Sequence, residues 1–100
     1  IGMTMHHFGV ELARYRIPLN YYSRAVINAE IWNPDTAISA GFYDTTAPVE
    51  HISAAASKAA ELFGNLDMGA FNGTKTKSRK AFLELLDQCI IDDLVLPEAP

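Results

Sequence analysis

The sequence contains little cysteine, few basic residues and no long apolar run. Cys89 is the single cysteine, so no disulfide can form within the chain, which is typical of a reducing compartment. Its apolar neighbours predict a buried, unreactive thiol. No apolar run approaches the roughly 20 residues that span a bilayer, and the start at Ile1 has no targeting character. We therefore expect a cytoplasmic protein without a membrane partner.

Basic residues are outnumbered, with 8 Lys and Arg against 12 Asp and Glu and a net charge of -4. Phosphate contacts rely on clustered cations, so this balance disfavours nucleic-acid binding. The basic cluster consists of Lys75, Lys77, Arg79 and Lys80. It is short and has no interleaved aromatic residues, so no nucleic-acid partner is expected. Adjacent His6 and His7 lack a nearby third ligand, so no metal site is expected either.

Apolar residues recur with helical spacing through most of the chain, which predicts a mostly α fold with a modest core. The expected helices cover residues 9–16, 19–31, 33–41, 48–64, 67–77 and 78–94. Asn33-Pro34 favours a helix start, and Gly41 favours the end of the same helix. Asp67 is a capping residue for the fifth helix. The broad apolar face of the last helix predicts burial on two sides, in part by another subunit.

Phe42–Thr46 is predicted to be one short strand. A strand needs a neighbour to satisfy its backbone N–H and C=O groups, and the rest of the chain is predicted to be mostly helical. The chain also begins abruptly at Ile1 rather than at Met. We therefore expect the chain to be one piece of a larger fold.

An ordered series of motifs resembles one protein family. Ala37-x-x-Ala40-Gly41-Phe42-Tyr43-Asp44, ending at Pro48, resembles the A-x-x-A-G-(L/F)-(V/Y)-(D/S)…P segment of the enoyl-CoA hydratase/isomerase family, or crotonase superfamily. Ile1-Gly2-Met3-Thr4 resembles the strand end and loop after that family's second acid. Glu11-Leu12-Ala13-Arg14 and Arg24-Ala25-Val26 resemble the two helices that follow. Thr74-Lys75-x-x-x-Arg79 resembles the T-K-x-x-x-R segment that opens the C-terminal helical region.

The resemblance implies the C-terminal helical half of an α/β fold built on a ββα spiral. Residues 1–48 would be the end of the crotonase core, and residues 49–100 a helical lid and oligomerisation region. The oxyanion-hole N–H groups and the catalytic acids would precede Ile1, in an N-terminal half absent from this chain. No catalytic residue is therefore assigned here, and the 100-residue segment alone is expected to be inactive.

The implied enzyme is an enoyl-CoA hydratase-like lyase of fatty acid metabolism. Oxyanion-hole donors would stabilise the enolate of an acyl-CoA thioester while a carboxylate moves the proton. Coenzyme A is part of the substrate, and no other cofactor is implied. The expected assembly is a homotrimer or a dimer of trimers. The alternatives are an enoyl-CoA isomerase, another crotonase-family reaction, or a non-catalytic helical interaction module.

Two groups of residues are site candidates. The substrate-lining candidates are Met5, His6, His7 and Phe8, because flexible apolar side chains suit an acyl pocket and an imidazole could select a polar acyl group or move a proton. The alternatives are a histidine pair in a loop and ordinary core packing. The basic cluster is the candidate for binding the phosphates of coenzyme A, and its alternative is a solvated helix face. Glu11 is predicted to be a surface charge with Arg14 as a weak partner.

Overall fold

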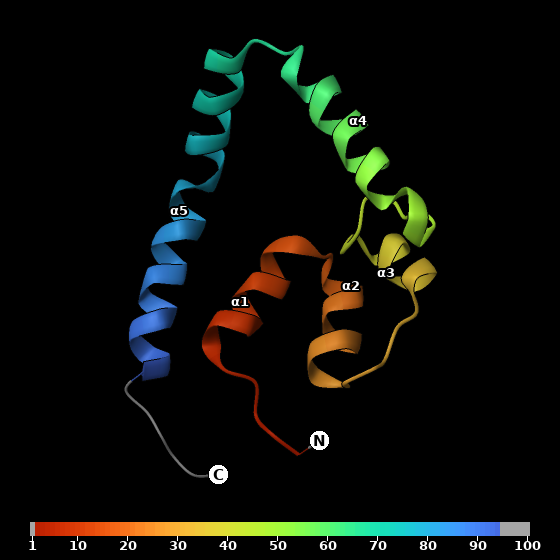
Figure 1. Cartoon of the computed structure of the whole chain (residues 1–100). Coiled ribbons are helices and arrows are strands. Elements are labelled where there is room, and N and C mark those ends of the chain that lie inside the picture. The colour runs from red at the N-terminus through yellow and green to blue at the C-terminus, as the bar shows by residue number, and fades with distance from the viewer. Residues whose placement is uncertain (1, 95–100) are drawn as a thin grey trace. The chain divides into compact units, whose positions relative to one another are not determined.

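The computed structural model describes residues 2–94, in which every regular element is a helix (Figure 1). This confirms the mostly α prediction. The chain divides into two compact units, one of residues 1–44 with 81–100 and the other of residues 45–80. Each unit is described by itself. None of the described helices is both long and apolar enough to cross a membrane.

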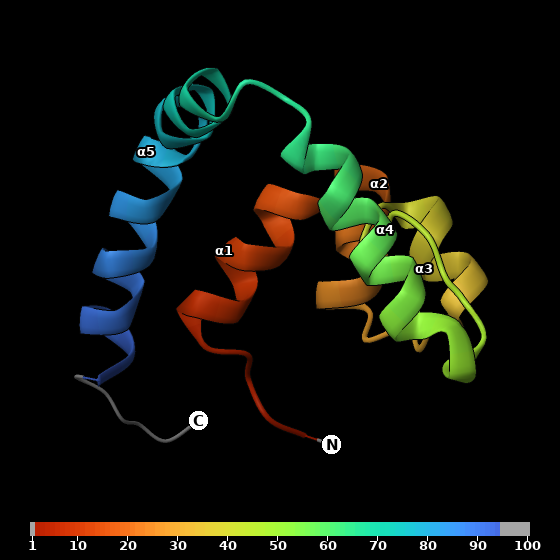
Figure 2. The same cartoon turned by 45° about the horizontal axis from the view of Figure 1, so that its top comes forward.

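The first unit contains most of the short helices. Its elements are α1 (His7–Arg16), α2 (Leu19–Tyr22), a π-helical turn η1 (Ser23–Ile27), α3 (Pro34–Ala40) and the C-terminal end of α5 (Met68–Leu94). Pro18 separates α1 from α2, because proline has no N–H to donate to the preceding turn. Figure 2 shows α1 beside the C-terminal, blue end of α5.

A small core holds the first unit together. Ala13, Ile17 and Tyr22 are buried at its centre. Partly buried side chains pack around them, namely Val10, Tyr21, Ala25, Val26, Trp32 and Phe42. Between α1 and α5, the ring of Tyr15 stacks on that of Phe82 with centroids 3.8 Å apart. Cys89 is buried, as its apolar neighbours predicted.

Helix α3 begins and ends where the sequence predicted. The Asn33 side-chain oxygen accepts a hydrogen bond from the Thr36 N–H at 2.9 Å, and Pro34 occupies the first turn. Gly41 has a φ of 100°, in the left-handed region that glycine adopts without a steric penalty. Its N–H donates to the carbonyls of Ala37 and Ile38, which satisfies the end of the helix.

The predicted helix over residues 19–31 ends earlier than expected. It changes from α to π hydrogen bonding at Ser23, and Ala29 then adopts a left-handed φ of 54°. The Glu30 N–H donates to the Arg24 carbonyl at 3.0 Å across this residue. The chain therefore turns away before Ile31, although no glycine or proline indicates the turn in the sequence.

The predicted strand is absent from the described residues, so the prediction of a strand at Phe42–Thr46 is wrong for this structure. The physical reason is the lack of a partner strand. Instead, the N–H groups of Phe42 and Tyr43 donate to the Ala37 carbonyl, at 2.9 Å and 3.4 Å. These bonds turn the start of the segment onto the end of α3.

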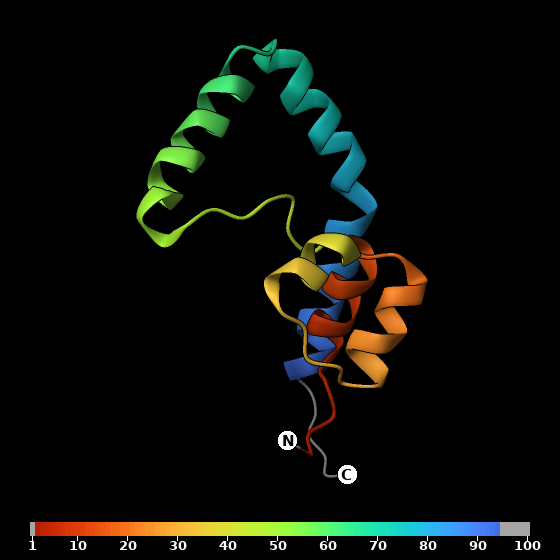
Figure 3. The same ribbon diagram turned by 90° about the vertical axis from the view of Figure 1, so that its right-hand side faces the viewer.

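The second unit contains a 3-10 turn η2 (Val49–His51), α4 (Ile52–Gly64) and the N-terminal part of α5. The turn between α4 and α5 is visible in Figure 3, where the green helix meets the teal one. Asp67 caps α5, and its side chain accepts a hydrogen bond from the Ala70 N–H at 2.9 Å. The end of α4 at Gly64 and the cap of α5 at Asp67 are both as predicted from the sequence.

Helix α5 runs without interruption from Met68 to Leu94. The prediction of two helices, 67–77 and 78–94, is therefore wrong. Gly73 lowers the helix propensity of this region, but by itself it does not end a helix. No proline follows it, so the hydrogen bonding continues through Ser78.

Candidate functional site

The substrate-lining candidates lie where the N-terminal segment enters α1. His6 is the N-cap residue of α1, with extended backbone angles, and its side chain makes no capping hydrogen bond. The first turn of α1 contains no acidic residue. The local sequence therefore supplies neither a side-chain acceptor for the free N–H groups of this turn nor a negative charge for the helix dipole.

Asp93, near the end of α5, supplies both the hydrogen-bond acceptors and the negative charge for the first turn of α1. Its Oδ1 atom accepts a hydrogen bond from the His7 N–H at 2.8 Å, and its Oδ2 atom accepts one from the Phe8 N–H at 2.9 Å. Each oxygen of the carboxylate thus binds one of two successive peptide groups. This explains why α1 begins at His7, two residues before the predicted start at Gly9.

The surroundings of Asp93 favour its charged form. Burial raises the pKa of the carboxyl group. Hydrogen bonds from the N–H groups of Phe8 and His7, together with the charges of His6 and His7, lower this pKa by more than burial raises it. The net result is a pKa below the ordinary value. The carboxylate is therefore ionised at neutral pH, when it caps α1.

The side chains of the segment fold back over the first turn of α1. A Cβ atom at Gly9 would lie 3.3 Å from Met5 Cγ and 3.4 Å from His6 Cε1. Gly9 thus leaves space that Met5 and His6 occupy. Phe8 is half-buried, whereas Met5, His6 and His7 are exposed. The structure therefore brings the four substrate-lining candidates together in one short, anchored segment.

Two other candidate groups behave as structural groups. Glu11 accepts a hydrogen bond from Arg14 Nε at 2.6 Å, and this bond is the main cause of the raised pKa of Arg14. The predicted pairing is confirmed. Burial, followed by the charges of Glu11, Asp93 and Asp92, raises the pKa of the Cys89 thiol. The thiol is therefore kept in its protonated, weakly nucleophilic form.

No metal centre is found in the part of the chain that the structure describes. There, no three residues among His, Cys, Asp and Glu are grouped so that they could hold a metal ion. His6 and His7 contribute to the field around Asp93 instead.

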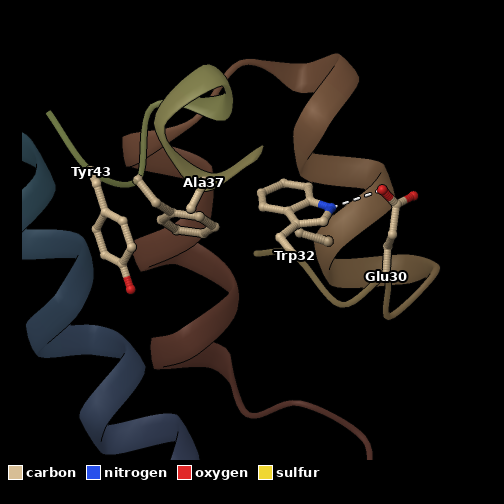
Figure 4. Close-up of a pocket in the computed structure, with 6 residues that line it drawn as sticks. Glu30, Trp32, Ala37 and Tyr43 are labelled. Carbon is tan, nitrogen blue, oxygen red and sulfur yellow. Dashed lines mark hydrogen bonds between the residues drawn. The ribbon is translucent and has the colours of Figure 1, made fainter. Parts of the chain in front are cut away.

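A shallow pocket of about 320 Å³ lies elsewhere in the first unit (Figure 4). Its lining residues are Ala25, Glu30, Trp32, Ala37, Phe42 and Tyr43. Trp32 Nε1 donates to Glu30 at 2.9 Å, and Arg24 also binds the Glu30 carboxylate. Hydrogen bonds from Arg24 and then Trp32 lower the pKa of Glu30. Sequence reasoning missed this cluster because Arg24 and Glu30 are six residues apart, which is not a helical pairing distance.

The basic cluster lies on α5 in the second unit. Lys75, Lys77, Arg79 and Lys80 are all exposed. The Nζ atom of Lys75 lies 5.8 Å from the centre of the Phe71 ring, within the range of a cation–π contact. The cluster belongs to the second unit, whereas the Met5–Phe8 segment belongs to the first.

Several solved structures are similar to this chain. No protein-family model and no curated protein sequence matches the chain. An enoyl-CoA hydratase/isomerase family protein from Pseudomonas syringae has a matching solved structure, with 44% sequence identity and a TM-score of 0.85 over 92% of this chain and 40% of that chain. An enoyl-CoA hydratase from Mycobacterium ulcerans matches with 30% identity and a TM-score of 0.82, over 89% of this chain and 39% of its own. The Mtb enoyl-CoA isomerase matches with 31% identity and a TM-score of 0.82, over 89% of this chain and 39% of that chain.

The helices of this chain therefore define part of a crotonase-type fold. In sequence and in structure, the chain corresponds to part of an enoyl-CoA hydratase/isomerase family protein, as its motifs predicted. It spans about 40% of the length of the solved relatives that it matches.

Proposed function

We propose that this chain is the C-terminal helical part of an acyl-CoA enzyme whose complete form is enoyl-CoA hydratase-like. The reaction is the addition of water across the 2,3-double bond of an acyl-CoA thioester. The observation that carries the proposal is the match to an enoyl-CoA hydratase/isomerase family protein, with 44% identity over 92% of the chain. The chain spans about two fifths of that protein, and the location proposed for the reacting groups is the part of the complete protein before Ile1.

The chemistry proposed for those residues is stabilisation of a thioester enolate. Negative charge develops on the thioester oxygen when the α-carbon loses or gains a proton, and preorganised N–H donors stabilise that charge best in a dry site. A carboxylate transfers the proton. Neither step requires a metal ion or a redox cofactor, so full activity is expected in the presence of a chelator.

Within this chain, the role proposed for Met5, His6, His7 and Phe8 is to line the acyl pocket. The support is their grouping in one segment whose backbone is anchored at two successive N–H groups. Met5 offers a flexible apolar surface, and Phe8 is half-buried. A pocket wall of this kind would influence which acyl chains are accepted more than how fast the proton moves.

The basic cluster is proposed to bind the phosphates of coenzyme A. Replacement of Lys75, Lys77 and Arg79 together by Ala is expected to raise KM for acyl-CoA several-fold with little change in kcat, and to weaken the salt dependence of KM. Lys58→Ala, on α4 of the same unit, is the matched control because it removes one cation outside the cluster. Unchanged KM in the triple variant would identify the cluster as a solvated helix face.

The reaction type is tested on the full-length protein with two substrates. Hydration of crotonyl-CoA, measured as the loss of the absorbance of its conjugated double bond, supports the hydratase. Conversion of a 3-enoyl-CoA to its 2-enoyl isomer without water addition supports the alternative isomerase, for which the 31% identity to the Mtb enoyl-CoA isomerase is the specific observation. Failure to bind or convert any acyl-CoA would contradict both.

The proposed assembly is a homotrimer or a dimer of trimers. It is supported by apolar side chains that α5 leaves exposed, such as Leu83 and Ile91. Light scattering on the full-length protein measures the assembly directly. A monomer at micromolar concentration would contradict it.

A further inference from the structure

The substrate-lining segment is anchored from outside its own part of the sequence. Asp93 binds the N–H groups of His7 and Phe8 through separate oxygens, at 2.8 Å and 2.9 Å. Both anchored residues belong to the proposed acyl wall. From the geometry we propose that Asp93 is a positioning residue, which determines the acyl-chain selectivity of the enzyme by fixing the wall formed by Met5–Phe8. This inference rests on the proposed function.

Two separate oxygens are needed for this anchor. A carboxylate can accept both hydrogen bonds, one on each oxygen, whereas an amide offers one oxygen and an NH₂ group that donates. At Asp93→Asn, one of the two N–H groups would therefore face a donor instead of an acceptor. The variant would release one of the two anchored peptide groups and leave the side chain almost the same size.

The anchor controls the side chains as well as the backbone. His6 immediately precedes the two anchored peptide groups, and Met5 and His6 fill the space above Gly9, where a Cβ atom would lie 3.3 Å from Met5 Cγ. Because this space lies directly over the first turn of α1, a shift of that turn moves both side chains. The acyl wall and its anchor thus move as one body.

Asp92 provides a matched control. It is the neighbouring residue on α5 and carries the same charge, but its Oδ1 atom accepts a hydrogen bond from Gln88 Nε2 on the same helix at 2.9 Å. Asp92→Asn therefore makes the same change in charge and size one residue away without affecting the bonds to α1.

The test compares kcat/KM for short and long straight-chain 2-enoyl-CoA substrates in the full-length protein. Asp93→Asn is expected to change the ratio of long-chain to short-chain kcat/KM on the order of tenfold, mainly through KM, because small displacements of a substrate-positioning group have large effects. Asp92→Asn is expected to leave the ratio unchanged. A merely structural role for Asp93 would lower kcat/KM for all chain lengths by one common factor, and that result would overturn the proposal.

Amide hydrogen exchange at His7 and Phe8 gives a second measurement that does not depend on activity. Exchange at the released amide of this pair is expected to become faster in Asp93→Asn, and exchange at both amides is expected to stay slow in Asp92→Asn. Unchanged exchange in Asp93→Asn would overturn the anchor. If Asp93→Asn does not fold, Asp93→Glu keeps both oxygens and moves the anchored turn by one methylene, and an unaltered chain-length ratio in that variant would equally overturn the proposal.

The proposed function and this inference fail in different ways. A wild-type protein that converts acyl-CoA substrates with a ratio insensitive to Asp93 contradicts the inference alone. A wild-type protein that binds no acyl-CoA contradicts the proposed function and, with it, the selectivity role of Asp93.

Discussion

Single side chains determine where the helices of the first unit begin. Asn33 caps α3 from three residues away, and Asp93 caps α1 from the other end of the chain. Both satisfy N–H groups that a helix leaves free in its first turn. They differ in sequence distance, and this difference decides which of them could be predicted.

Replacement of Asn33 by Ala is expected to destabilise the first unit. The hydrogen bond from the Thr36 N–H at 2.9 Å is lost, and loss of an N-cap lowers the free energy of unfolding by about 0.5–2 kcal/mol. Urea unfolding of the full-length protein measures the change. Asn33→Ser keeps an acceptor oxygen and is the control, so equal losses in the two variants would contradict the cap.

Acid is expected to weaken the contact between Asp93 and α1. The folded pKa of Asp93 lies below its ordinary value of 3.8, so its contribution to stability is present above pH 3.8 and is lost as the pH falls through the folded pKa.

The measurement is the thermal midpoint of the full-length protein as a function of pH, for the wild type and for Asp93→Asn. The difference between the two midpoints is expected to shrink as the pH falls below 3.8, because Asp93→Asn has no charge to lose. Asp92→Asn should follow the wild type. A constant difference between the wild type and Asp93→Asn over this range would contradict the assignment.

At the residue scale, local signals were predictable and distant ones were not. Asn33, Gly41 and Asp67 act on residues within four positions, so the sequence alone located them. Asp93 acts on residues 85 and 86 positions away, and no local pattern reveals such a partner. The substrate-lining role of Met5, His6, His7 and Phe8 stays a prediction, and the anchor of their segment was found only in the structure.

At the scale of elements, glycine has opposite effects at two positions. Gly41 has a φ of 100° at the end of α3, whereas Gly73 lies inside α5 with open space where a Cβ atom would be. A side chain at Gly41 would be strained, but one at Gly73 would be accommodated and would favour the helix.

Gly41→Ala is therefore expected to lower the free energy of unfolding by about 1 kcal/mol or more, and Gly73→Ala to raise it by about 0.5–1 kcal/mol. Urea titration of the two variants checks both signs in one experiment. An increase in both variants would show that glycine acts at these sites through the unfolded chain rather than through helix geometry. A decrease in both would contradict the space for a side chain at Gly73.

Two of the errors at this scale have a common physical origin. The sequence predicted a break after residue 77, at the end of a helix that Gly73 weakens, and a strand at Phe42–Thr46. Propensity is a weak signal compared with backbone hydrogen bonding. Continuous bonding carries α5 through Gly73, while a strand without a neighbour has no bonding to stabilise it.

At the scale of the whole molecule, many apolar side chains remain uncovered. Ile31 is 96% exposed, Val49 83% and Leu94 82%. The apolar residues of α4 that follow helical spacing, such as Ile52 and Phe63, are more than half exposed. Apolar surface of this extent is typical of a chain that packs against further protein.

The isolated 100-residue chain is accordingly expected to aggregate or to unfold without a sharp transition. Its small core supplies little of the apolar burial that a stable domain of this size needs. Circular dichroism and analytical ultracentrifugation of the chain, beside the full-length protein, measure this directly. A monomeric chain with a cooperative transition would contradict the expectation and would favour an independent helical interaction module.

The bond between Asp93 and α1 also has a consequence for the order of events during synthesis. His7 leaves the ribosome 86 residues before Asp93, so the first turn of α1 lacks its cap until those residues have been made. Closing so long a loop carries an entropic cost that local contacts do not. The turn that positions Met5–Phe8 is thus expected to be among the last parts of the first unit to become ordered, after α3, whose cap and stop signals lie within its own few residues.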